Sequence, residues 1–263
     1  MTRFIGRRDF IRFAAGLCVA AHGAPAMAGG GGGSRGCCIV PANANGAYRD
    51  LFNAPPTQEA QSPWRRRLSD ASGVSRRFER QLGGVLADIS RHFEVVPGFS
   101  FYDDEDSPNA IAIDKAVIQT TKGTVAFGRR LLREQLAIDG QGISIAAISA
   151  HEFAHIFQYQ SGFFDRIERE YPRHIIELQA DFLAGVYLHH FEQSRQNISL
   201  QGVGRAWEEM GETRFTKRST HGTTEMRLDS IQEGYFWRRQ NPDERLYRAA
   251  SAGLDHVRQY AEG

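Results

Sequence analysis

Two histidines and a glutamate interrupt an otherwise apolar segment, ISIAAISAHEFAHIFQYQ, at residues 143–160. His151 and His155 are four residues apart, so a helix would place both imidazoles on one face with Glu152 beside them. This spacing is typical of two metal ligands accompanied by a general base. Core histidines bonded to backbone groups are the alternative. An unpaired buried charge costs several kcal/mol, however, and the pattern therefore predicts a metal centre.

A catalytic zinc site needs three protein ligands and one open position, so another segment must supply a ligand. The third histidine of the metzincins would stand at residue 161, which is serine, and that class is excluded. The segment PRHIIELQADFLAGVYL, residues 172–188, offers Glu177 and Asp181 four residues apart in apolar surroundings. Glu177 is the predicted third ligand, and Asp181 is the predicted acceptor for the free N–H of a ligand histidine. His174 remains a rival ligand at this point.

HEFAH followed by ELQADFLAG resembles the gluzincin metallopeptidases, in which the glutamate of ExxxD completes an HExxH site. The chain is similar to the bacterial neutral zinc metallopeptidases and, more distantly, to peptidases of the CaaX prenyl protease type. The resemblance runs from about Val85 to Trp237. It implies a zincin-like domain with one Zn²⁺ ion held by His151, His155 and Glu177.

The same resemblance implies the mechanism of an endopeptidase. Zinc would lower the pKa of its water toward ~7, and Glu152 would take the proton and return it to the leaving amine. THGTTEMRLDSIQEGYFW contains His221, which is implied to stabilise the oxyanion, and Arg227, which is implied to bind substrate. SPNAIAI, with Asn109 and Ala110, is expected to hold an extended peptide by strand addition.

Two other functions remain open on the sequence alone. A catalytically silent metal-binding chaperone or assembly factor of the cell envelope would keep the ligands and lose the glutamate of HExxH, which is present here as Glu152. A metallohydrolase acting on another amide or on an ester would need the same residues. Mixed imidazole and carboxylate ligation with an open position favours zinc over other divalent ions.

The first 28 residues have the basic start, short apolar run and small-residue cleavage site of an export signal. Arg7 and Arg8 followed by DFIR resemble a twin-arginine signal, with a Sec signal as the alternative. The expected location is the bacterial periplasm or the exterior, with membrane contact only during export. Residues 29–73 predict a flexible linker, and residues 74–263 the metallopeptidase domain. The adjacent Cys37 and Cys38 give no disulfide framework.

The 263 residues are 41% hydrophobic and 24% charged with a net charge of +1, and nothing in this composition indicates a nucleic-acid surface. A peptide or protein substrate is the expected partner. Strand patterns at FSFY, NAIAID, AVIQT and GTVAFG precede helical patterns at 129–138, 143–160, 172–193, 200–210, 223–239 and 243–261. They predict an α+β fold with a small antiparallel or mixed sheet followed by a mostly helical half. DDEDSPN is predicted to be a solvated turn, with a calcium loop as the alternative.

Overall fold

The structure of the protein, a computed structural model, describes residues 38–39, 76–102, 104, 108–116, 121–138, 142–194 and 221–261. The export signal predicted for residues 1–28 lies outside the described residues. So does the predicted linker, residues 29–73, apart from Cys38–Ile39. The helix predicted at 200–210 and residues 117–120 of the AVIQT strand also lie outside them.

A small mixed sheet forms one part of the fold. Its main strands are β2 (Gly98–Tyr102), β3 (Ala110–Ile113) and β4 (Thr124–Gly128), and β1 (Cys38–Ile39) adds two residues. The strand order is β1-β3-β4-β2. β4 pairs antiparallel with β3 and parallel with β2, while β1 pairs parallel with β3. All residues of β3 and β4 are buried, as expected for a sheet that is covered on both faces.

Helices form the remainder of the described chain. They are α4 (Arg76–Phe93), α5 (Arg129–Ile138), α6 (Ile143–Ser161), α7 (Phe163–Glu170), α8 (His174–Ser194), α10 (Thr224–Gln240) and α11 (Leu246–Val257), which is followed by a 3₁₀ helix, η2 (Arg258–Tyr260). The predicted α+β class, with a small mixed sheet and a mostly helical remainder, is confirmed. α7 was not predicted from the sequence; this short helix begins directly after Gly162, where the backbone is left-handed with φ 78°.

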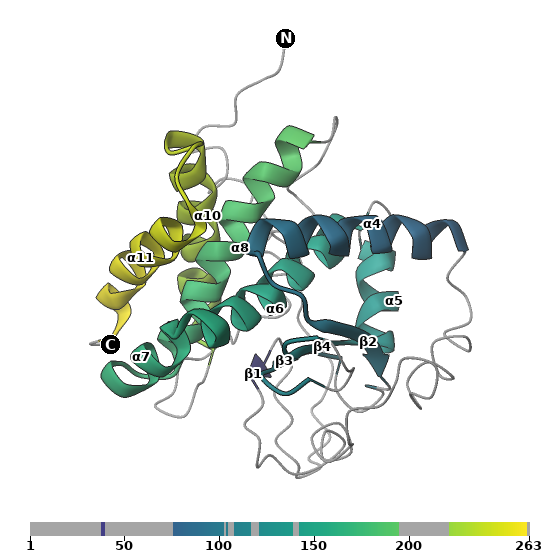
Figure 1. Ribbon diagram of the computed structural model, residues 1–263, viewed down its shortest axis with the longest axis horizontal. Coiled ribbons are helices and arrows are strands. Elements are labelled where there is room, and N and C mark those ends of the chain that lie inside the picture. Colours follow the sequence, from purple (N-terminus) through teal and green to yellow (C-terminus); the bar gives the residue numbers. More distant parts are fainter. Residues whose placement is uncertain are drawn as a thin grey trace, which may run out of the picture.

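The central helix of the fold is α6. It contacts β3 and β4 of the sheet as well as α4, α5, α7 and α8, and Figure 1 shows it between the sheet and the C-terminal helices. Every residue from Ile143 to Ile156 is buried, which is typical of a helix that is covered all round. The polar motif of this helix therefore lies inside the core.

The backbones of α8 and α10 approach each other closely. A Cβ added at Gly185 would overlap the carbonyl oxygen of Ile231, and one added at Gly234 would overlap the carbonyl oxygen of Phe182. Glycine is therefore required at both positions, because any larger residue would push the two helices apart. The packing holds Arg227, in the first turn of α10, next to α8.

Asp104 is a buried capping residue, which corrects the prediction of a solvated turn at this position. Its side chain is 5% exposed. Oδ1 accepts a hydrogen bond from the backbone N–H of Arg130 at 2.6 Å, and Oδ2 accepts from those of Leu131 at 3.0 Å and Asn109 at 3.2 Å. The carboxylate thus satisfies the free N–H groups at the start of α5. A Cβ at Gly128 would overlap this carboxylate, so glycine is needed there.

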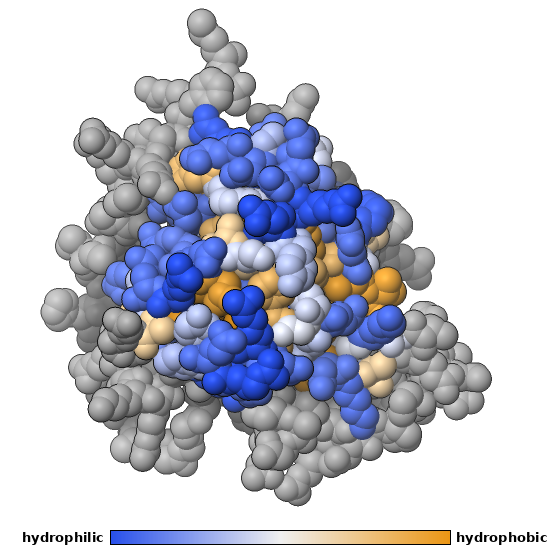
Figure 2. Space-filling view, turned by 60° about the vertical axis from the view of Figure 1, so that its left-hand side comes forward, coloured by the Kyte–Doolittle hydropathy of each residue, from blue (hydrophilic) through white to orange (hydrophobic). Residues whose placement is uncertain are grey.

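The described surface is largely hydrophilic on the side that carries α11. Figure 2 brings that side forward and shows hydrophilic residues over much of it, with hydrophobic residues between them. Val96 and Tyr247 are the large hydrophobic residues with high exposure in the described ranges. Among the helices of these ranges, none has both the length and the hydrophobicity needed to cross a bilayer.

Candidate metal centre

Side chains of His151, His155 and Glu177 converge between α6 and α8. The Nε2 atoms of the two histidines are 3.0 Å apart, and each lies 3.4 Å from Oε2 of Glu177. All three side chains are at most 1% exposed. Among the described residues this is the group of histidines and acids whose ligand atoms all lie within 4.8 Å of one another. Two imidazole nitrogens and a carboxylate oxygen facing one another need a positive charge between them, and a metal ion fits that need.

Gln158 fixes the tautomer of His155. The side-chain amide of Gln158 donates to the carbonyl of Ile176 and to Oε1 of Gln179, both at 2.9 Å. Oε1 of Gln158 is therefore the atom that faces Nδ1 of His155, at 2.7 Å. Because Oε1 can only accept, His155 carries its proton on Nδ1 and keeps a lone pair on Nε2. This is the tautomer that binds a metal through Nε2.

The support of His155 extends to a third helix. Gln179, which holds Gln158, donates its own side-chain amide to the carbonyl of Ala250 in α11 at 2.8 Å. Gln158 and Gln179 are both fully buried, and each is satisfied by the other. A chain of hydrogen bonds therefore runs from the imidazole of His155 through α8 to the backbone of α11.

His151 is held by a carboxylate. Its Nδ1 lies 2.8 Å from Oδ1 of Asp181, where the sequence predicted that acceptor. Asp181 in turn accepts two hydrogen bonds from Arg227, from Nε at 2.7 Å and from Nη2 at 2.9 Å. Asp181 and Arg227 are both 0% exposed. Arg227 thus balances the buried charge behind His151, which makes it a positioning residue rather than the substrate-binding residue expected from the sequence.

Electrostatics make the metal-free centre attractive to a cation. Burial disfavours charge on His151, but Asp181, Glu177 and Glu152 together raise its pKa to about 9. Burial also opposes ionisation of the two acids. The neighbouring histidines nevertheless lower the pKa of Glu177 well below its usual range, and Arg227 and His151 lower that of Asp181 to about 2. Both carboxylates are therefore ionised at neutral pH. Their negative charge favours a positive charge at the face of α6 that carries His151 and His155.

The two predicted catalytic side chains lie within the same core. Glu152 follows His151 in α6 and is 0% exposed. His221 comes just before α10, is 3% exposed, and is one of the groups that lower the pKa of Glu177. The structure therefore brings an acid from α6 and an imidazole from the start of α10 to the neighbourhood of the three candidate ligands.

The predicted strand-addition residues belong to the interior of the sheet. Asn109 is 3% exposed and Ala110 is 0% exposed. The carbonyl of Asn109 accepts hydrogen bonds from the Tyr102 hydroxyl at 3.1 Å and from the Gly128 N–H at 2.9 Å. β3 also has β1 on one side and β4 on the other. These contacts correct the expectation that Asn109 and Ala110 hold a peptide, because both residues are committed to the sheet.

His174, the rival ligand, lies outside the convergent group. Its Nε2 lies 2.9 Å from the carbonyl oxygen of Tyr260, in η2, so the ring links α8 to the C-terminal 3₁₀ helix. Gln158 and Gln179, in contrast, were not predicted as site residues from the sequence. Both are side-chain amides within apolar segments, and this is the feature by which the sequence could have identified them. Gln158 comes three residues after His155, and Gln179 comes two residues after Glu177.

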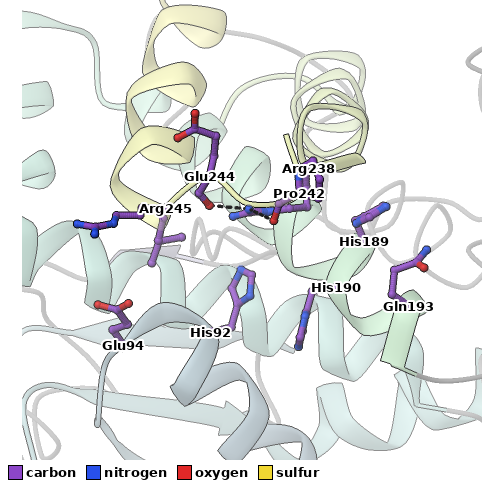
Figure 3. A pocket seen from close by; sticks show the side chains of 10 residues that line it. His92, Glu94, His189, His190, Gln193, Arg238, Pro242, Glu244 and Arg245 are labelled. Atoms are coloured by element: carbon purple, nitrogen blue, oxygen red, sulfur yellow. Dashed lines mark hydrogen bonds between the residues drawn. The ribbon is translucent and has the colours of Figure 1, made fainter. Parts of the chain in front are cut away.

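A separate pocket lies near the C-terminal end of α8. It has a volume of about 410 Å³ and is lined by the ends of α4 and α8 and by the α10–α11 connection. Figure 3 shows His92, His189 and His190 around it, with Arg238 reaching across. Nη1 of Arg238 donates to the carbonyls of Asn241, Pro242 and Glu244 at 3.2, 3.1 and 2.6 Å. None of the site residues predicted from the sequence lines this pocket.

Comparisons with protein-family models, with curated proteins and with solved structures find no match to this chain. Any functional assignment consequently depends on its motifs and on the geometry of the buried group.

Proposed function

We propose that this protein is a zinc-dependent endopeptidase of the gluzincin type, with His151, His155 and Glu177 as the metal ligands. The observation that carries the proposal is the convergence of these three side chains, with Nδ1 of each histidine already committed to an acceptor. Imidazole and carboxylate donors suit zinc, and three protein ligands leave a position for substrate chemistry.

The surrounding residues have roles that follow from their chemistry. A zinc ion held there would supply Lewis-acid chemistry, polarising a carbonyl and making water acidic enough to lose a proton near neutral pH. Glu152 accepts that proton and returns it to the amine nitrogen as the peptide C–N bond breaks. His221 donates a hydrogen bond to the carbonyl oxygen as negative charge develops on it. Asp181 and Gln158 keep the two ligand imidazoles in the metal-binding tautomer.

Export is a second part of the proposal. Residues 1–28 carry the twin-arginine pattern at Arg7 and Arg8, and we infer export to the bacterial periplasm or beyond. A protein exported in the folded state can receive its metal before it crosses the membrane. The substrate would then be a peptide or protein of the cell envelope or the exterior.

Glu152→Gln tests the assignment as an enzyme. Glutamine keeps the shape of the side chain but cannot accept a proton, so casein hydrolysis should fall by ~10²–10⁴, the contribution of general acid–base catalysis. Zinc content should stay at the wild-type level, because Glu152 is not a ligand. Glu168→Gln, an exposed change on α7, is the matched control and should retain full activity.

Two outcomes would contradict the proposal. Equal hydrolysis by wild type and Glu152→Gln would remove Glu152 as the base. Failure of the fully zinc-loaded wild type to cleave any member of a broad peptide library would favour the silent metal-binding chaperone of the envelope.

A further inference from the structure

Tyr159 lies on the part of α6 that carries the catalytic motif. It follows His155 by four residues and Glu152 by seven, and both spacings place side chains on the same helical face. Side chains on a helix lean toward its N-terminus. The ring of Tyr159 therefore starts one turn beyond His155 and leans back toward Glu152.

The ring of Tyr159 is held by α7. Its centroid lies 4.6 Å from that of Phe164, with the two planes tilted by 37°. Gly162, whose backbone is left-handed, lies between the two residues and both ends α6 and begins α7. Tyr159 thus has a fixed ring position at the end of the motif helix.

Charged groups from three segments influence the pKa of the phenol. Burial raises the pKa of Tyr159, and the carboxylates of Asp114, Glu177 and Glu152 raise it further, against the opposing effect of Arg173. Asp114 directly follows β3, Arg173 precedes α8, and Glu177 is the candidate ligand. The phenol is therefore protonated at neutral pH, and it belongs to α6, the helix that contacts both β3 and α8.

The hydroxyl of Tyr159 has unused hydrogen-bonding capacity. Within the described ranges it makes no hydrogen bond to another protein group. The residue is partly exposed, so the hydroxyl can be reached from outside. A protonated phenol among carboxylates is suited to an uncharged acceptor, because an anionic ligand would be repelled by its neighbours.

We propose that Tyr159 binds the substrate, its hydroxyl donating a hydrogen bond to a main-chain carbonyl oxygen of the peptide. This inference rests on the proposed endopeptidase function and deepens it. The preference for an uncharged carbonyl suits a site that takes the interior of a peptide chain rather than its terminal carboxylate.

Tyr159→Phe removes the hydroxyl and keeps the ring contact with Phe164. The probe is a fluorescein-labelled peptide spanning a casein sequence that the wild type cleaves. Its affinity is measured by fluorescence anisotropy on zinc-loaded Glu152→Gln protein, with and without Tyr159→Phe, so that no cleavage interferes. Loss of one neutral hydrogen bond should weaken binding about 2- to 10-fold. In the otherwise wild-type enzyme KM should rise by a similar factor with kcat little changed.

The control is Tyr247→Phe, which removes a hydroxyl from a residue that is 57% exposed on α11 and should change neither value. Zinc content and melting temperature should equal those of the wild type in both variants. Unchanged peptide affinity in Tyr159→Phe, when the wild type cleaves the peptide, would overturn the inference and leave the proposed function intact. Loss of zinc would overturn it in favour of a structural role. A wild type that neither binds nor cleaves peptides would remove the proposed function and this inference together.

Discussion

Two groups of histidines lie near opposite ends of α8, and they differ in what surrounds them. His151 and His155 face Glu177 near the start of α8, with nitrogen and oxygen atoms 3.0–3.4 Å apart. His92, His189 and His190 line the pocket at the other end. Among the described residues the first group meets the distance requirement for a metal site and the second does not.

Electrostatic surroundings separate the two groups further. Carboxylates overcome burial at His151 and raise its pKa to about 9. At His92, burial and then His190 and Arg238 lower the pKa to about 3, against a smaller opposing effect of Asp88. The pocket thus disfavours a positive charge where the core site favours one.

The hydrogen bonds behind the rings explain why spacing alone does not make a metal site. Nδ1 of His151 faces a carboxylate and Nδ1 of His155 faces an amide oxygen, so both rings present Nε2 to the same point. Each core histidine thus has an acceptor behind it that orients Nε2 toward the candidate metal position.

Of the variants that test the difference between the two histidine groups, Glu177→Ala should have the largest effect, on zinc content. The variant should lose most of its zinc after dialysis, because two histidines remain where three ligands are needed. Glu94→Ala, in the pocket, and His174→Ala should both retain about one zinc per chain, the stoichiometry of a single site. Metal analysis of the purified proteins measures this. Zinc loss from either control, with retention in Glu177→Ala, would reverse the assignment of the two regions.

Removal of the acceptors behind the ligands should have smaller, graded effects. Asp181→Asn should weaken zinc binding by about 10- to 100-fold, and Gln158→Leu by about 10-fold, because charged acceptors hold an imidazole more strongly than neutral ones. Chelator competition gives the affinities, and circular dichroism checks folding, since Asp181→Asn also leaves Arg227 without its carboxylate. Equal losses in the two variants would show that the charge of Asp181 has no special role.

His92→Phe should have the smallest effect, which is a change in the pH dependence of the free energy of unfolding at acidic pH. The folded-state pKa of His92, about 3, lies below the ordinary histidine value of 6.5, so the unfolded chain binds more protons between these values. The contribution of His92 is fully present above about pH 6.5 and is lost as the pH falls toward 3. The metal-free variant should lose stability less steeply than metal-free wild type, by at most about 1.4 kcal/mol per pH unit. Urea unfolding between pH 6.5 and 4.5 measures the two slopes, and identical slopes would contradict the burial of His92.

Local sequence patterns were sufficient to identify the three candidate ligands. His151, His155 and Glu177 lie on two apolar helices, where polar residues at four-residue spacing are conspicuous. The same periodicity predicted the limits of α5 and α6 closely. These features depend on residues near one another in the chain, which is why they can be read without the fold.

Residues whose role depends on packing between distant segments could not be assigned in this way. Arg227 meets Asp181 only because Gly185 and Gly234 let α10 approach α8. Asp104 caps a helix that begins 25 residues later in the chain. In both cases the sequence shows a charged residue, and only the tertiary structure shows which buried group it satisfies.

The hydrogen bonds from Gln158 through Gln179 to Ala250 have a consequence for the order of maturation. Gln179 and Ala250 are 71 residues apart in the sequence, so this bond forms only when α11 has docked on α8. The hydrogen-bonded support of His155 is therefore complete only once α11 is in place. A partly folded chain would present the same ligands with weaker affinity. Tight metal binding by this candidate site would thus require all three helices to be assembled.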